Sequence, residues 1–148
     1  MKPAFHAAAS FAIAGTLYLY TAAGASCFIA GVFIDLDHIP DYILQGGLKN
    51  TSRGQALKDF FSSRGDRLYL VLHSYELLFI LLLAGRISGW SMIMLGTAAG
   101  AASHMVIDQV SNGIKYNLAP LFYFLTLRAM KGFRKELLTG DPAGTMER

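Results

Sequence analysis

Cysteine is almost absent from this sequence, with Cys27 the only thiol among 148 residues. A single thiol excludes an internal disulfide and every zinc motif built from several cysteines. A metal site in this chain would therefore need histidine and carboxylate ligands. Cys27 lies within an apolar run, which indicates a packing role.

Charge is also scarce, because only 16% of the residues are charged, whereas soluble domains average roughly 25%. Hydrophobic residues make up 53% of the chain, and the mean hydropathy is +0.40. The formal net charge of +3 is too small to indicate a nucleic-acid partner. The composition predicts an integral membrane protein of one domain, over residues 1–138, with the lipid bilayer as its partner.

Long uncharged stretches predict an all-α bundle of about four membrane-spanning helices. No charged residue occurs between His6 and Asp35, and the small residues at 21–26 divide that stretch into two helices. We expect the spanning helices at residues 3–20, 25–44, 68–84 and 90–110, since each approaches the roughly 20 residues that a bilayer requires. Ser111, Asn112 and Gly113 are expected to end the last helix.

The remaining segments predict how the bundle lies in the membrane. Residues 46–67 form a polar loop with five Lys and Arg residues and a short amphipathic helix at 55–61. Arg86 is the only basic residue in the other short loop, so the positive-inside rule places loop 46–67 and the N-terminus in the cytoplasm. Residues 118–130 predict a short apolar or interfacial helix, and the tail at 139–148 is expected to be frayed.

Ionisable residues gather at one end of this expected bundle, because successive helices run in alternate directions. They are His6, Asp35, Asp37, His38, Asp41, His73, Glu76, His104 and Asp108. An ionisable group inside a span costs roughly 2.5 to 3.5 kcal/mol, so such groups are usually paired and functional. A divalent cation would compensate a cluster of histidines and carboxylates, which predicts a metal site on one membrane face.

The local spacing of these residues supports chelation. His104 and Asp108 are four residues apart and His73 and Glu76 are three apart, so each pair projects from one face of a helix. Pro40 biases the residue before it away from helical geometry, so the segment around it is expected to leave the helix.

Several of these residues also have structural interpretations. His6 is compatible with an interfacial residue, and Asp41 with a helix cap. Glu76 could pair with Arg67 or Arg53 near the interface. A structural hydrogen bond is the alternative for His104 and Asp108. Gly96 and Gly100 form a small-residue pattern typical of close helix packing.

The order of the motifs resembles the YdjM-like family of inner-membrane, metal-dependent hydrolases. The shared features are an early histidine, His6, then Asp35-Leu36-Asp37-His38, then His73-Ser74, and finally Ser103-His104 with Asp108. The family usually has proline where this chain has Ile34, and basic residues where it has residues 70–72. The family is distantly similar to zinc phospholipase C and P1-type nucleases, which implies zinc-dependent hydrolysis of a phosphoester or ester.

The resemblance leads to an expected division of roles at a bacterial inner membrane. His6, Asp37, His73, His104 and Asp108 are the expected ligands of a divalent metal, with zinc favoured. Asp35, His38 and Glu76 are the candidates for the general base or for a residue that orients a ligand. A lipid-like substrate would suit a site at the cytoplasmic boundary. Two alternatives remain open, a metal-binding or ion-coupled transporter and a non-enzymatic membrane scaffold.

Overall fold

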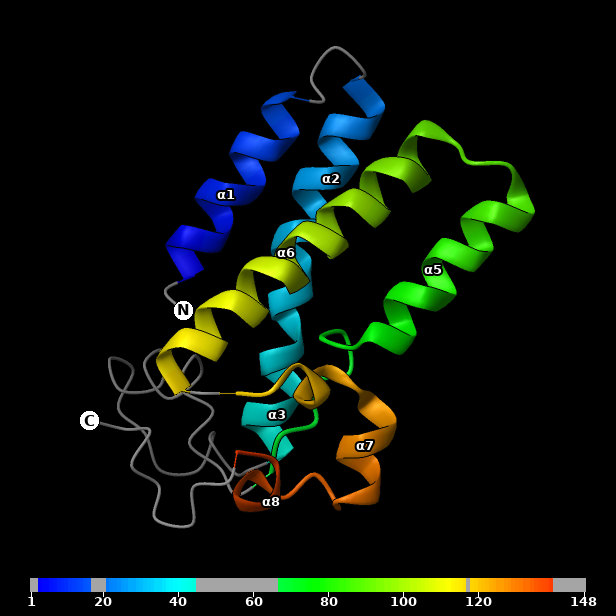
Figure 1. Cartoon of the computed structure of the whole chain (residues 1–148). Coiled ribbons are helices and arrows are strands. Elements are labelled where there is room, and N and C mark those ends of the chain that lie inside the picture. Colours follow the sequence, from blue (N-terminus) through cyan, green and yellow to red (C-terminus); the bar gives the residue numbers. More distant parts are fainter. Residues whose placement is uncertain (1–2, 17–20, 45–66, 117, 140–148) are drawn as a thin grey trace.

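The computed structural model describes residues 3–16, 21–44, 67–116 and 118–139, and its fold is all-α, as the sequence predicts (Figure 1). The α-helices are α1 (Pro3–Thr16), α2 (Thr21–Phe33), α3 (His38–Leu44), α5 (Tyr75–Ser88), α6 (Met92–Tyr116), α7 (Leu125–Met130) and α8 (Lys135–Thr139). Two 3₁₀ turns, η1 (Ile34–Asp37) and η2 (Pro120–Tyr123), precede α3 and α7.

The α2 and α6 helices form the centre of the fold, and α1 packs beside them (Figure 1). Their close crossing depends on the two glycines that the small-residue pattern identifies. A Cβ atom on Gly96 would collide with the backbone of Ala23, and one on Gly100 would collide with the backbone of Cys27. The expected packing role of both glycines is therefore confirmed, and so is the buried position of Cys27.

The chain departs from regular α-helix earlier than Pro40 predicts. The departure is η1, a tighter 3₁₀ turn that ends at Asp37, and α3 then continues through Pro40. Proline is tolerated there because it lies in the first turn of α3, where its missing N–H group would have no helical partner. Asp35 and Asp37, both in this turn, lie next to different nitrogen atoms of the His73 ring.

The third expected span corresponds to α5, which begins at Tyr75, seven residues later than the predicted position 68. Ser74 is the reason, because its hydroxyl accepts a hydrogen bond from Leu77 N at 3.3 Å and caps the helix. Residues 67–74, called the His73 loop below, are not helical, and Leu70 adopts a left-handed φ of 39°. Their backbone groups bind side chains of other elements.

The α6 helix continues to Tyr116, so residues 111–113 do not end it as expected. Asn112 would favour a turn if its side chain bound the nearby backbone. Its amide instead donates a hydrogen bond of 3.0 Å to the hydroxyl oxygen of Tyr123, which is a tertiary contact. Gly113 has only ordinary contact distances around it, and it remains within the helix.

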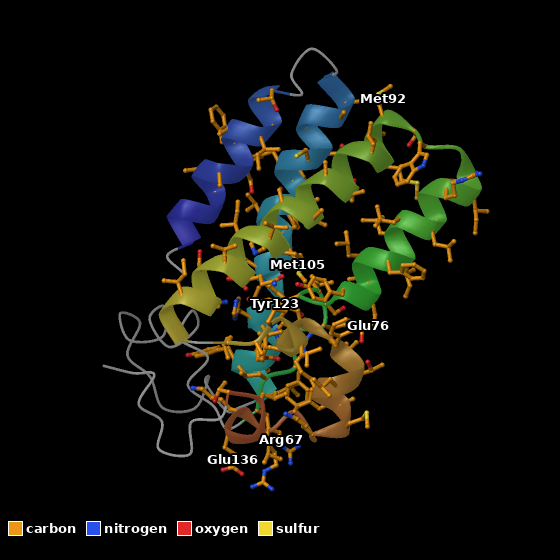
Figure 2. The ribbon with its side chains drawn as sticks, viewed as in Figure 1. Arg67, Glu76, Met92, Met105, Tyr123 and Glu136 are labelled. Atoms are coloured by element: carbon orange, nitrogen blue, oxygen red, sulfur yellow. The ribbon has the colours of Figure 1, made fainter. Side chains whose placement is uncertain are left out.

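Residues 118–130 contain η2 and α7 in place of one apolar helix, and α8 follows them. This C-terminal segment covers the end of the fold where the buried hydrophobic core lies. That core consists of Ile34, Leu68, Leu70, Met105, Phe122 and Tyr123. Figure 2 shows Met105 and Tyr123 close to each other at this end.

Among the described residues, Ala22–Leu44 is the one helical stretch with both the length and the hydropathy to cross a membrane. It has 23 residues and a hydropathy of 1.4, but a signal sequence or a buried core helix can share these properties. The arrangement of four spans stays a prediction. The expected amphipathic helix at 55–61 and residues 140–148 of the expected frayed tail lie outside the described residues.

Candidate metal centre

Three segments bring Asp35, His38 and His73 together. Asp35 lies in η1, His38 begins α3, and His73 lies just before the capping residue of α5. One ligand atom from each residue lies within 4.8 Å of the others, which is close enough for a shared metal ion. The rings of His38 and His73 lie 5.5 Å apart between their centroids.

His104 extends this group from α6. Its ring lies 5.2 Å from that of His73, and it is almost completely buried. The Nδ1 atom lies 2.7 Å from the carbonyl oxygen of Gly31. Because a carbonyl can only accept, Nδ1 is the donor in this contact, and in the neutral ring Nε2 keeps the lone pair that a metal ion requires. The Nε2 atom lies 3.4 Å from Asp35 Oδ1. Asp35, His38, His73 and His104 are called the candidate metal centre below.

The distances around Asp35 fit a shared cation better than direct hydrogen bonds. Asp35 Oδ1 lies 3.6 Å from His73 Nε2 and 3.4 Å from His104 Nε2. Hydrogen bonds between nitrogen and oxygen usually measure about 2.7–3.2 Å. Two ligands that bind one zinc ion at about 2.0–2.1 Å and a tetrahedral angle lie about 3.3 Å apart. Both Asp35 contacts are close to this spacing, so the carboxylate and the two rings could hold one cation.

Asp37 faces the other nitrogen of His73 and orients its ring. Its Oδ2 atom lies 3.4 Å from His73 Nδ1, and it accepts hydrogen bonds from the backbone N–H groups of Leu72 and His73 at 2.5 and 3.2 Å. A carboxylate at Nδ1 fixes the tautomer of a metal-binding histidine. The arrangement directs His73 Nε2 towards Asp35, as metal binding requires.

Carboxylates also set the protonation of His73. Burial disfavours the charged ring, but the nearby carboxylates of Asp35, Asp37 and Asp108 outweigh it and raise the pKa of His73 to about 9. The surroundings of this ring therefore favour positive charge.

A buried arginine binds the His73 loop from the opposite side. Arg128, in α7, is 0% exposed. Its guanidinium donates hydrogen bonds of 2.7 Å to the carbonyl of Tyr69, 2.8 Å to that of Leu70 and 2.8 Å to that of His73. Burial lowers the pKa of Arg128, although nearby carboxylates oppose this effect. The guanidinium thereby stabilises a loop whose left-handed Leu70 would otherwise be strained.

Asp41 completes the binding of the loop. It is almost completely buried, and its Oδ2 atom accepts a hydrogen bond of 3.0 Å from Tyr69 N. This contact joins Asp41 to a backbone group 28 residues away in sequence, a tertiary role beside the helix cap that its position allows. Asp37 and Asp41 bind N–H groups of the loop while Arg128 binds its carbonyls, so charged side chains fix the position of His73 from two sides.

The other expected site residues have different surroundings. Asp108 accepts a hydrogen bond of 3.0 Å from the hydroxyl of Tyr123 and acts electrostatically on His73. Glu76 accepts hydrogen bonds from Leu125 N at 2.8 Å and Thr126 N at 2.9 Å, at the start of α7. Together with a hydrogen bond of 2.7 Å from the hydroxyl of Thr126, these bonds hold the pKa of Glu76 low, at about 2, against the opposing effect of burial. Figure 2 shows Glu76 beside α7. The backbone of His6 lies in α1, and its side chain is outside the described part of the chain.

Sequence reasoning missed Arg128 and Tyr123. The available signal was their placement, since each carries a polar group within an apolar segment at 118–130. A polar group in such a segment usually has a buried partner.

The fold and the site define an all-α protein with a buried aspartate–histidine cluster that could hold a metal ion. Comparison of the chain with protein-family models, with curated proteins and with solved structures found no match. The resemblance to YdjM-like hydrolases therefore rests on the sequence motifs alone.

Proposed function

We propose that the protein is a membrane-bound, metal-dependent hydrolase with zinc at the candidate metal centre. The observation that carries the proposal is the position of Asp35 Oδ1, which lies 3.6 and 3.4 Å from the Nε2 atoms of His73 and His104. One carboxylate between two imidazole nitrogens, with a third imidazole nearby, is a donor set that zinc prefers.

The geometry suggests a different division of roles from the one expected from the motifs. Asp35 and His38, expected as a base or an orienting residue, are proposed as ligands with His73 and His104. Asp37, expected as a ligand, orients His73 through Nδ1. Asp108 has one oxygen bound by Tyr123, and its carboxylate is proposed to accept the proton of the attacking water.

A bound zinc ion would lower the pKa of its water to about 7 and polarise the ester oxygen of the substrate. In the proposed reaction, the oxygen of water bonds to the phosphorus or carbonyl carbon, and a proton goes to the departing alcohol oxygen. Zinc binding requires neutral imidazoles and ionised carboxylates, so the ion would displace the proton that the nearby carboxylates favour on His73.

Exposed apolar side chains support a membrane location. Phe79, Ile80 and Ile87 on α5 are 64%, 60% and 78% exposed, and Ala22–Leu44 has the length of a membrane span. Such a surface is unusual for a soluble monomer. The sequence pattern supports an enzyme over a carrier, because residues 7–34 and 87–103 contain no Asp, Glu, His, Lys or Arg that could form a pathway through the bilayer.

The first test measures the zinc content of the detergent-purified protein prepared without chelator. We expect stoichiometric zinc in the wild type and at least a tenfold weaker affinity in Asp35→Asn, since loss of one charged ligand opens the site. Glu136→Gln is the matched control, because Glu136 is exposed and pairs with Arg134. A wild-type protein without zinc, or equal zinc affinity in both variants, would contradict the metal centre.

The second measurement separates the enzyme from the carrier. Zinc-loaded protein is assayed for hydrolysis of a phosphodiester and of phospholipids, and for zinc flux in liposomes. Turnover that Asp35→Asn abolishes supports the hydrolase. Flux without turnover would instead favour a carrier.

A further inference from the structure

An apolar cavity of about 290 Å³ lies between α2, α5 and α6. Its size is near the lower end of pockets that bind small molecules, roughly 300–1,000 Å³. Apart from Ser74 and Thr97, its lining is apolar, and Leu78, Leu81, Ala101 and Met105 represent it. Figure 1 shows α5 and α6 running in opposite directions, joined by a short turn.

The cavity and the candidate metal centre share a boundary. Ile34, Leu72 and Met105 line the cavity. Each is next in the sequence to one proposed ligand, which is Asp35, His73 and His104 respectively. Ser74 lines the cavity as well and follows His73. A molecule in the cavity would therefore have its apolar part between the helices and its polar end next to the ligands.

The surroundings of the cavity identify the apolar part of that molecule. Phe33 and Leu36 line the cavity yet are 56% and 45% exposed, so the cavity is open to the outside of the fold. Both belong to the stretch Ala22–Leu44, which has the length and hydropathy of a membrane span. In a bilayer, the apolar groups outside this opening are acyl chains, and a volume of about 290 Å³ limits the cavity to a single chain.

We infer that the cavity binds one acyl chain of a membrane phospholipid and places its phosphate at the candidate metal centre. The inference rests on the proposed function, because it names the substrate class of the same site. A divalent ion attracts the anionic phosphate, and an acyl chain that enters the cavity from the bilayer exchanges one apolar environment for another, so its insertion requires no desolvation of polar groups. Together they would select a lipid phosphoester over a small water-soluble one.

The experiment uses the full-length protein in nanodiscs of phosphatidylethanolamine and phosphatidylglycerol that contain a phospholipid with a photoactivatable acyl chain. After irradiation, mass spectrometry maps the labelled residues. We expect labelling of Leu78, Ala101 and Met105 to exceed that of Phe79 and Ile80, which are exposed and report lipid around the protein. Equal or lower labelling of the cavity residues in the wild type would overturn the inference.

Two variants test whether the labelling arises inside the cavity. Ala101→Phe fills it from α6 and should reduce labelling of Leu78 and Met105 at least fivefold, while labelling of Ile80 stays constant. Val106→Phe is the control on the same helix, because Val106 is 61% exposed and does not line the cavity. Leu81→Trp fills the cavity from α5 and replaces Ala101→Phe if that variant does not fold. Unchanged cavity labelling in a folded filling variant would contradict the inference.

Zinc content is measured on the same samples, so that the two proposals fail separately. Zinc binding without cavity labelling rejects the acyl site and leaves the metal centre. Cavity labelling without zinc rejects the hydrolase and reduces the inference to a lipid-binding cavity. Preferential labelling that Ala101→Phe removes, in a protein that retains zinc, supports both.

Discussion

At the scale of single residues, the unusual feature is a set of buried charges that bind peptide groups instead of one another. Arg128 donates to carbonyls of the His73 loop, and Asp37 and Asp41 accept from its N–H groups. Charge-assisted hydrogen bonds of this kind are stronger than neutral ones, about 1.5–3 kcal/mol each. They fix a short non-helical segment that carries a ligand.

The first prediction concerns Arg128. Arg128→Met should lower stability by about 3–5 kcal/mol, because three buried carbonyls lose a charged donor, and should weaken zinc binding at least tenfold because His73 is no longer fixed. Arg128→Lys should recover part of the stability but little of the zinc affinity, since an ammonium group lacks the planar fork of donors. Thermal unfolding and zinc competition with a chelator measure the two effects.

The control for Arg128 is Arg86→Met, the same substitution at an exposed position in the last turn of α5. It should change neither quantity appreciably. If Arg128→Met bound zinc as tightly as Arg86→Met, the role of Arg128 in positioning His73 would be rejected.

The residues of the candidate metal centre were largely predictable, whereas the residues that position them were not. The scarcity of charge made His73, His104 and Asp35 conspicuous in the sequence. Arg128 was not identified because its partners are backbone carbonyls 55 to 59 residues away, which leave no pattern of side chains. The separate roles of Asp35 and Asp37 depend on the 3₁₀ geometry of η1, which their spacing alone does not determine.

At the scale of helices, the contact between α2 and α6 sets the distance between two sides of the site. Asp35 follows α2 directly, and His104 lies on α6 one turn beyond Gly100. The carbonyl of Gly31 on α2 accepts the Nδ1 proton of His104. The glycines that let the helices approach therefore also place a ligand pair within 3.4 Å.

The second prediction tests this contact with Gly100→Ala. The new methyl group would collide with the backbone of Cys27 and push the helices apart, so both thermal stability and zinc affinity should fall. Gly113→Ala is the matched control in the same helix, since its Cβ would meet only Leu118 O at 3.7 Å. It should raise stability by up to about 1 kcal/mol through helix propensity.

If Gly100→Ala had the same stability and zinc affinity as Gly113→Ala, the prediction would be contradicted. The helices α2 and α6 would then not approach as closely as the structure shows.

The helices themselves were predictable where hydropathy determines them and less so where tertiary contacts do. The helices α1 and α2 and most of α6 follow from apolar runs with few charges, although the sequence predicts α2 and α3 as one helix. The start of α5 was misplaced because residues 68–72 are as apolar as the helix that follows. Their backbone binds Asp37, Asp41 and Arg128, and this binding outweighs helix propensity.

At the scale of the whole molecule, the candidate metal centre joins segments that are far apart in sequence. Its ligands come from η1 and the start of α3, from the His73 loop and from α6. An ion bound by all three segments would oppose their separation on unfolding. Stability should then depend on free zinc, because a ligand that binds only the folded state stabilises it.

The last prediction follows from this linkage. Free zinc at one hundred times its dissociation constant should stabilise the wild type by about 2.7 kcal/mol and raise its melting temperature, and chelator should reverse the rise. Asp35→Asn should show no such dependence over the same zinc concentrations, because the shared ligand is lost. Glu136→Gln should respond as the wild type does, since its exposed carboxylate is remote from the site. An equal response in Asp35→Asn would place the stabilising zinc elsewhere in the chain.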